Sequence, residues 1–95
     1  HYEEALPDFS EAIKLKSDDS TFWSARALIN YIIGRYSDAI NDCSQAIKMD
    51  HKNADAWGIR GAAYQATGKS ELANNDCTKA IQTGPTLPLT YYALG

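Results

Sequence analysis

Apolar residues recur along most of this chain at the three- and four-residue spacing that is typical of amphipathic helices. The clearest example is residues 53–85. There Trp57, Gly61 and Tyr64 share one stripe of a predicted first helix, and Gly68 ends that helix at a position that needs positive φ. A second helix is predicted by the spacing of Ala73, Cys77, Ala80 and Ile81. We expect Gly61 to lie where the two helices cross, because a side chain there would hold them apart.

The same pattern occurs one hairpin earlier in the chain, and we call equivalent positions of successive hairpins a column. Trp23 matches Trp57, and Gly34 matches Gly68. The other columns that recur at a spacing of about 34 residues are Ala5, Ala39 and Ala73; Phe9, Cys43 and Cys77; Ala12, Ala46 and Ala80; and Ile13, Ile47 and Ile81. Self-similarity at a fixed period is the signature of a repeat architecture, so the pattern predicts an all-α repeat protein.

The repeat register divides the chain into parts of one domain. Residues 1–19 are predicted to hold the second helix of a partial repeat, 20–53 and 54–87 are full repeats, and 88–95 start a further repeat. Because the first part lacks its partner helix, we expect the chain to be a fragment of a longer array. Tyr2, Leu6 and Phe9 at one end would then be uncovered, as would Tyr91 and Tyr92 at the other.

This pattern resembles the signature of a known helical repeat, W-x2-L-G-x2-Y in the first helix followed by A-x3-F and then P in the second. Its positions are matched by Trp57, Gly61, Tyr64, Ala73 and Pro85, whereas Arg60 replaces the Leu and Cys77 the Phe. The chain thus resembles the tetratricopeptide repeat (TPR) family over nearly its whole length. The resemblance implies an α-α superhelix, a right-handed solenoid of helix-turn-helix repeats. It implies structural roles for Trp23, Trp57, Gly61, Tyr64, Ala39, Ala73, Cys43 and Cys77.

Charged residues also follow the repeat. Arg26 and Arg60 share one column, and Asp8, Asp42 and Asp76 share another. A first helix in stacked hairpins touches the second helices before and after it, so we expect Arg26 to pair with Asp8 or Asp42. By the same reasoning Arg60 pairs with Asp42 or Asp76. Arginine suits such a site because its fork binds a carboxylate twice while its stem covers apolar surface, and we interpret the ladder as structural.

Several polar residues are expected to bond to backbone. Asn30 lies in the packing stripe, and we expect its amide to bond to a neighbouring backbone group. Asn53 is a candidate N-cap for the helix that follows it. Ser17, Asp18, Asp19 and Ser20 are candidates for the helix predicted from about residue 21.

The resemblance further implies that partners bind in a concave groove lined by the first helices. Its columns in this chain are Thr21, Ser24, Ala25, Leu28, Tyr31 and Ile32; Asp55, Gly58, Ile59, Ala62, Gln65 and Ala66; and Leu89, Tyr92 and Ala93. This surface is small and apolar with one acid, Asp55. We expect Leu28, Ile59 and Tyr92 to anchor a bound peptide or partner helix.

Some family members capture the acidic C-terminal tails of heat-shock chaperones through a clamp of Lys, Arg and Asn. The strings NDCSQAI and NDCTKAI are similar to those co-chaperones. However, Ala25 occupies the Asn column, and Asp55 and Ile59 occupy the Lys and Arg columns. An acidic tail would meet Asp55 without a countercharge, so we do not expect these repeats to form such a clamp. Repeats outside this chain could carry one.

Composition narrows the function classes. Charged residues make up 22% of the chain and the formal net charge is −3, so there is no basic footprint for nucleic acid or an anionic membrane. No apolar run approaches the ~20 residues of a membrane span, and no charged-then-apolar leader opens the chain. We therefore expect a cytoplasmic protein.

No catalytic or metal-binding constellation is found in the sequence. Repeat spacing should hold the Cα atoms of Cys43 and Cys77 roughly 9–10 Å apart, beyond the ~7 Å limit for a disulfide, so we expect free buried thiols and no metal. There is no nucleophile with a base, no paired catalytic carboxylates and no phosphate-binding glycine loop. We predict that the chain is not an enzyme and needs no cofactor.

Three functions stay open at this point. The favoured hypothesis is a protein-protein interaction scaffold whose groove takes a peptide with apolar anchors. The alternatives are a structural spacer or self-association module, forming homo-oligomers through uncovered end helices, and a co-chaperone-like adaptor whose clamp or enzyme partner lies elsewhere.

Overall fold

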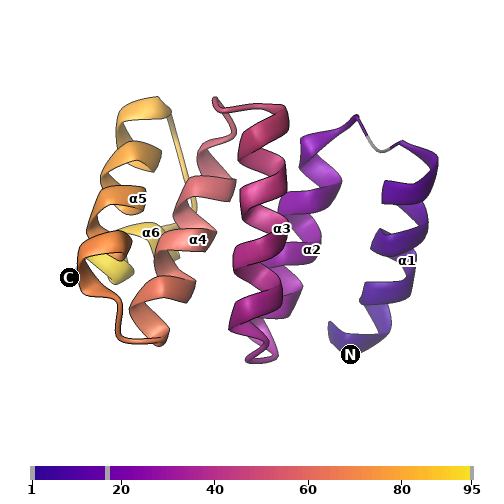
Figure 1. The fold of residues 1–95 in the computed structure, drawn as a ribbon, viewed down its shortest axis with the longest axis horizontal. Helices are drawn as coiled ribbons and strands as arrows, with labels where there is room; N and C mark the ends of the chain where they lie inside the picture. The colour runs from indigo at the N-terminus through magenta and orange to yellow at the C-terminus, as the bar shows by residue number, and fades with distance from the viewer. Residues whose placement is uncertain (1, 17, 95) are drawn as a thin grey trace.

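The computed structural model describes residues 2–16 and 18–94, and these form six α-helices in a row. The helices are α1 (Tyr2–Leu15), α2 (Ser20–Ile32), α3 (Tyr36–Met49), α4 (Ala54–Ala66), α5 (Ser70–Thr83) and α6 (Pro88–Leu94). Figure 1 shows α2 with α3 and α4 with α5 as antiparallel hairpins stacked side by side, with α1 at one end and α6 beside α4 and α5 at the other. The architecture is an α-α superhelix, as predicted.

The helix ends follow from local sequence. Gly34 and Gly68 adopt φ of +86° and +80° directly after α2 and α4, and a side chain at such a φ would be strained. At the start of α2, the Asp19 side chain accepts a hydrogen bond from the Thr21 backbone N–H at 2.9 Å. These residues confirm the predicted turn glycines and one of the predicted caps.

Asn53 has a double role at the start of α4. Its Oδ1 accepts a hydrogen bond from the Ala56 backbone N–H at 3.1 Å, which confirms the predicted cap. Its Nδ2 lies within hydrogen-bond distance of Ser20 Oγ and Ser24 Oγ on α2, at 3.2 and 3.3 Å. One side chain therefore both begins a helix and ties that helix to the preceding hairpin.

The core is built from small residues that let the helices approach closely. A Cβ on Gly61 would lie 2.5 Å from Cys77 Sγ and 3.1 Å from the Ala73 carbonyl oxygen, so the α4–α5 crossing excludes any side chain there, as predicted. Two clusters fill the interior. The first contains Ala27, Cys43 and Ile59 from α2, α3 and α4, and the second contains Ala62, Cys77 and Ala93 from α4, α5 and α6.

Both cysteines are free and buried, as predicted. Burial raises the pKa of the Cys43 and Cys77 thiols above the ordinary value, so they are protonated and serve as small apolar core groups. No helix in residues 2–16 and 18–94 combines the length and apolar character needed to cross a membrane.

Helices α2, α4 and α6 begin at Ser20, Ala54 and Pro88, which are the first residues of the predicted parts 20–53, 54–87 and 88–95. The division of the chain into repeats itself stays a prediction.

Candidate functional site

The arginine column is the most strongly bonded polar feature of the stack. Arg60 Nε donates to Asp76 Oδ2 at 2.7 Å, its Nη2 donates to Asp76 Oδ1 at 3.0 Å, and its Nη1 donates to Ser44 Oγ at 3.1 Å. Partial burial lowers the pKa of Arg60, but the hydrogen bond and charge of Asp76 outweigh it and hold that pKa above its ordinary value. The guanidinium of Arg60 thus joins α3, α4 and α5.

Arg26 repeats this arrangement one hairpin earlier. Its Nε and Nη2 donate to Asp42 Oδ2 and Oδ1 at 2.9 and 2.7 Å, and its Nη1 donates to Ser10 Oγ at 3.1 Å. Of the two predicted partners, Asp42 is the one that binds, whereas Asp8 is exposed on α1. The predicted pairings of both arginines are thus confirmed in one of their two alternatives.

The prediction that the Asn30 amide bonds to a neighbouring backbone group is wrong. Asn30 Nδ2 instead donates to Asp42 Oδ2 at 3.1 Å. Asp42 is buried and already accepts from Arg26, so the amide satisfies a remaining lone pair of that carboxylate. Among the described residues, every buried side-chain nitrogen and oxygen has a hydrogen-bond partner.

Aromatic rings cover the two arginines. The guanidinium carbon of Arg26 lies 5.1 Å from the ring centroid of Trp23, and that of Arg60 lies 5.1 Å from Trp57. Tyr64 adds a second ring over Arg60 at 5.8 Å. These are cation–π distances, so each guanidinium binds a carboxylate and also contacts an aromatic ring.

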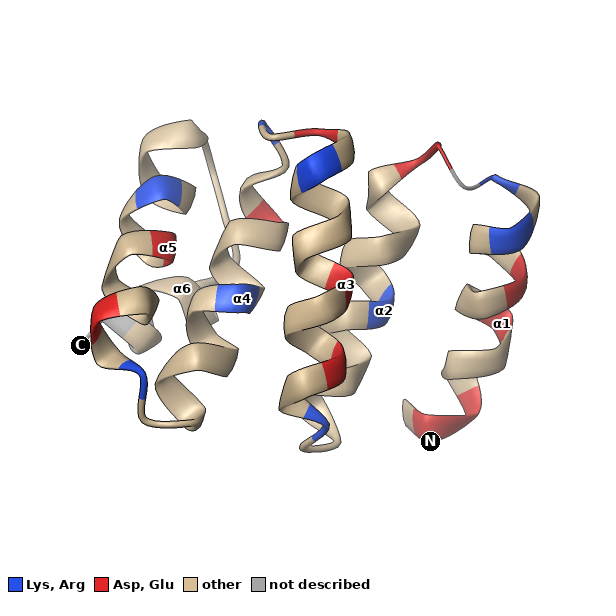
Figure 2. Cartoon of the chain, viewed as in Figure 1, with Lys and Arg blue, Asp and Glu red and all other residues tan. Residues whose placement is uncertain are grey.

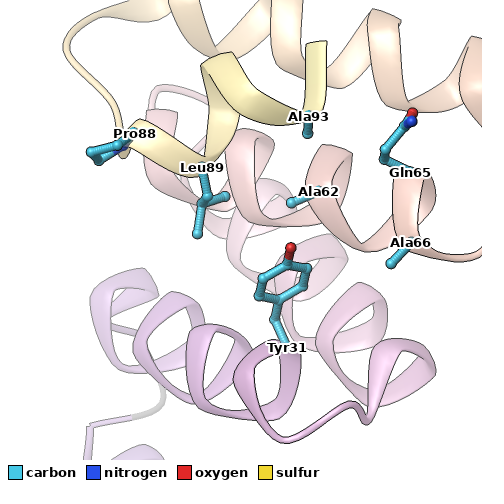
Figure 3. Close-up of a pocket in the computed structure, with 7 residues that line it drawn as sticks. All are labelled: Tyr31, Ala62, Gln65, Ala66, Pro88, Leu89 and Ala93. Carbon is cyan, nitrogen blue, oxygen red and sulfur yellow. The ribbon is translucent and has the colours of Figure 1, made fainter. Parts of the chain in front are cut away.

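A hollow lies between α2, α4 and α6. Its volume is about 490 Å³, within the range of small-ligand pockets. It is lined by Tyr31, Ala62, Gln65, Ala66, Pro88, Leu89 and Ala93. Figure 3 shows Tyr31 pointing from α2 toward Ala62. Apolar atoms dominate the lining, and the polar groups are the Tyr31 hydroxyl and the Gln65 amide.

Some of the predicted groove residues are not accessible. Ile59 is only 1% exposed because it packs on Cys43 of the preceding second helix, so the expectation that it anchors a ligand is wrong. Ser24 is 6% exposed because it lies against Asn53 at the α2–α4 contact. Gly58 is buried too: a Cβ there would collide with Thr90 on α6.

The remaining groove residues differ in exposure. Thr21, Ile32, Asp55, Gln65 and Ala66 are exposed, while Ala25, Leu28, Tyr31 and Leu89 are half-buried. Ala62 and Ala93 are buried but form the floor of the hollow. Tyr92 was also predicted to line the groove and anchor a ligand, but its side chain lies outside the described part of the chain. Pro88 also lines the hollow and is absent from the groove residues predicted from the sequence.

Charged residues are scarce on α2, α4 and α6, the helices that frame the hollow. Figure 2 shows charged positions spread over α1, α3 and α5, but α2 carries one basic position, α4 one of each sign, and α6 none. The two basic positions are Arg26 and Arg60, whose guanidinium groups point to the second helices. Asp55, in the first turn of α4, is therefore the only ionised side chain among the groove columns.

No protein-family model and no curated protein sequence matches this chain, but solved structures do. The Arabidopsis OM64 TPR domain superposes with a TM-score of 0.89 at 27% identity, covering 98% of this chain and 77% of that one. The second TPR domain of human RPAP3, in complex with the HSP70 peptide SGPTIEEVD, gives 0.86 at 27% identity, covering 98% and 78%. The second TPR of Spaghetti (RPAP3), bound to the HSP90 peptide SRMEEVD, gives 0.83 at 28% identity, covering 86% and 76%.

Proposed function

This chain is built of tetratricopeptide repeats, and from that premise we propose that it is a protein-interaction module. Its concave face takes a short segment of a partner, which inserts an apolar side chain into the hollow between α2, α4 and α6. The observation that carries the proposal is the hollow itself, since it is apolar, open and framed by three successive first helices. Affinity comes from a few desolvated side chains, because the surface is nearly uncharged.

We propose anchor contacts that differ from those predicted from the sequence. Ile59 is buried, and Leu28 packs against the core, so a charged substitution at either residue would disturb the fold. Ala66 and Gln65 are exposed at the rim of the hollow, and Leu89 forms its wall. These three residues meet the partner side chain while the core stays intact.

The acidic peptides of the two RPAP3 complexes are not carried over to this chain. Each ends in EEVD, which brings three acidic side chains and a terminal carboxylate to the groove. The first helices here offer no cation on that face, and Asp55 would repel such a peptide. A clamp for acidic tails would have to lie in repeats outside this chain.

The test is selection of binders from a random peptide library displayed on phage, with the purified domain immobilised. Selected peptides are then synthesised and their dissociation constants measured with the parent chain and with Ala66→Glu. We expect enrichment of one aromatic or branched apolar residue and a loss of at least about tenfold in affinity, since Glu places a charge at the rim of the apolar hollow.

The matched control is Thr78→Glu, which adds the same charge at an exposed position of second helix α5. Its binding should equal that of the parent chain. Failure to select any peptide, or binding that Ala66→Glu leaves unchanged, would overturn the proposal.

Self-association is the second candidate function, because large apolar side chains stay exposed at both ends of the stack. Tyr2 on α1 is 54% exposed and Tyr91 on α6 is 55% exposed. Stacking of two copies would cover them. Sedimentation velocity from low to high micromolar concentration tests this: a concentration-dependent rise supports it, and a constant monomer value refutes it. The cytoplasmic location and the lack of enzymatic activity stay predictions.

A further inference from the structure

Two hollows lie near opposite ends of α4, and one is polar while the other is apolar. Near the start of α4, the hollow between the first two hairpins is lined by polar side chains that include Thr21, Asn53 and Asp55. Near the end of α4, Ala62 and Ala66 line the apolar hollow. A partner peptide lying along α4 would therefore contact a polar surface at one end of the helix and an apolar surface at the other.

Asp55 contributes an exposed negative charge to the polar end. It is exposed, and within the described chain no hydrogen bond or ion pair engages its carboxylate. Asp50 lines the same polar hollow and Lys52 is the one cation there, so that end carries a net negative charge. The arginines on α2 and α4 cannot compensate, since both are bound to Asp42 and Asp76 on the other side.

The position of Asp55 on the helix also gives a spacing. Ala62 and Ala66 lie roughly 10 and 16 Å along α4 from Asp55 at a rise of about 1.5 Å per residue, a length that an extended peptide spans in about three to five residues at about 3.3 Å each. A side chain that reaches Asp55 and an anchor that fills the hollow are thus separated by that number of residues in one ligand.

We infer that the groove selects an extended segment carrying a lysine or arginine about three to five residues from its apolar anchor. This inference rests on the proposed function and specifies its partner class: a basic, apolar-anchored peptide. Complementary charge at an exposed site adds modestly to affinity and mainly excludes acidic competitors.

The experiment uses the tightest peptide from the library selection as host. Lys, Gln or Glu is placed three, four or five residues from the anchor on either side, and binding is measured by fluorescence polarisation. At the best position we expect Lys to bind about 2- to 5-fold tighter than Gln, and Glu about as much weaker. The differences should shrink in 0.5 M salt.

Reversal of the charge completes the test. Asp55→Lys should invert the order so that the Glu peptide binds best, and Asp55→Asn should abolish the difference. Glu71→Lys is the matched control, because Glu71 also lies in the first turn of a helix but on the second helix α5. It changes the net charge and the helix terminus in the same way, and should preserve the order.

The outcomes separate the two proposals. Peptides that lose affinity in Ala66→Glu but show no charge preference, or a preference that Asp55→Lys leaves unchanged, overturn this inference alone. If no peptide binds in a manner sensitive to Ala66→Glu, the proposed function fails and this inference fails with it.

Discussion

Arg60 and Asp76 form a bidentate ion pair, with Nε donating to Oδ2 at 2.7 Å and Nη2 donating to Oδ1 at 3.0 Å. The Asp76 side chain is 7% exposed and that of Arg60 is 19% exposed. Arg26 holds Asp42 with the same two-point geometry one repeat earlier. The hairpins α2–α3 and α4–α5 therefore each contain one charge pair with a buried carboxylate and a partly buried guanidinium. Loss of one partner leaves the other charge unpaired, which is costly.

Removal of the carboxylate should strongly destabilise the stack. We expect Asp76→Ala to lower the free energy of unfolding by about 3 kcal/mol, since Arg60 would keep its partly buried charge without a counterion. Urea denaturation followed by circular dichroism measures this, at low temperature if the variant is marginally folded. The control Asn75→Ala changes an exposed neighbour on the same helix and should cost about 0.5 kcal/mol or less. Equal midpoints for the two variants would contradict the prediction.

Asn53 allows the cap and the inter-repeat contact to be measured separately. Asn53→Ala removes both, and we expect a loss of about 1–3 kcal/mol. Asn53→Asp keeps the oxygen that accepts from Ala56, but loses the donor that reaches Ser20 and Ser24. It should therefore fall between the parent chain and Asn53→Ala in denaturant midpoint. If Asn53→Asp equals the parent chain, the amide contributes nothing to the contact between α2 and α4.

Gly61 tests the packing of α4 on α5. Gly61→Ala places a methyl group 2.5 Å from Cys77 Sγ, and the resulting separation of the helices should cost about 1–3 kcal/mol despite the better helix propensity of alanine. The double variant Gly61→Ala with Cys77→Ala should recover only part of this loss, because the Ala73 carbonyl oxygen still lies 3.1 Å from the new Cβ. Thermal unfolding that shows Gly61→Ala to be neutral or stabilising would contradict the crossing geometry.

The sequence predicted those features that depend on one repeat and its own period. The turn glycines Gly34 and Gly68 and the close crossing at Gly61 are confirmed, because each is required by the local geometry of a hairpin. The arginine column was predicted with two alternative partners. The sequence could not choose between them, since Asp8 and Asp42 share a column and only the stacking distance distinguishes them.

The groove was harder to predict because core and groove positions share one apolar stripe of a first helix. Ile59 and Ala66 are seven residues apart and therefore lie on nearly the same face of α4. Ile59 is covered by Ala27 and Cys43 of the preceding hairpin, whereas Ala66, about two turns further along, stays exposed at the hollow. Hydrophobicity alone does not separate a core position from an apolar binding surface. Pro88 was missed for a related reason, because its contact with the hollow depends on how α6 packs against α4.

The two buried thiols predict a pH dependence of stability. Burial raises the pKa of Cys43 and Cys77, whereas thiols in the unfolded chain ionise near about 8.5. Above that pH the unfolded state binds fewer protons than the folded state, so the free energy of unfolding falls as pH rises, by up to ~1.4 kcal/mol per pH unit for each thiol. Below about pH 8 this contribution is fully present. The measurement is urea denaturation of the parent chain and of the double variant Cys43→Ala with Cys77→Ala. It is made at pH 7.5, 8.5 and 9.5, about one unit apart around the thiol pKa, and it compares how steeply the free energy of unfolding falls with pH in the two chains. Since the double variant keeps every other titrating group, equal slopes for the two chains would show that the thiols ionise as readily in the folded state as in the unfolded one.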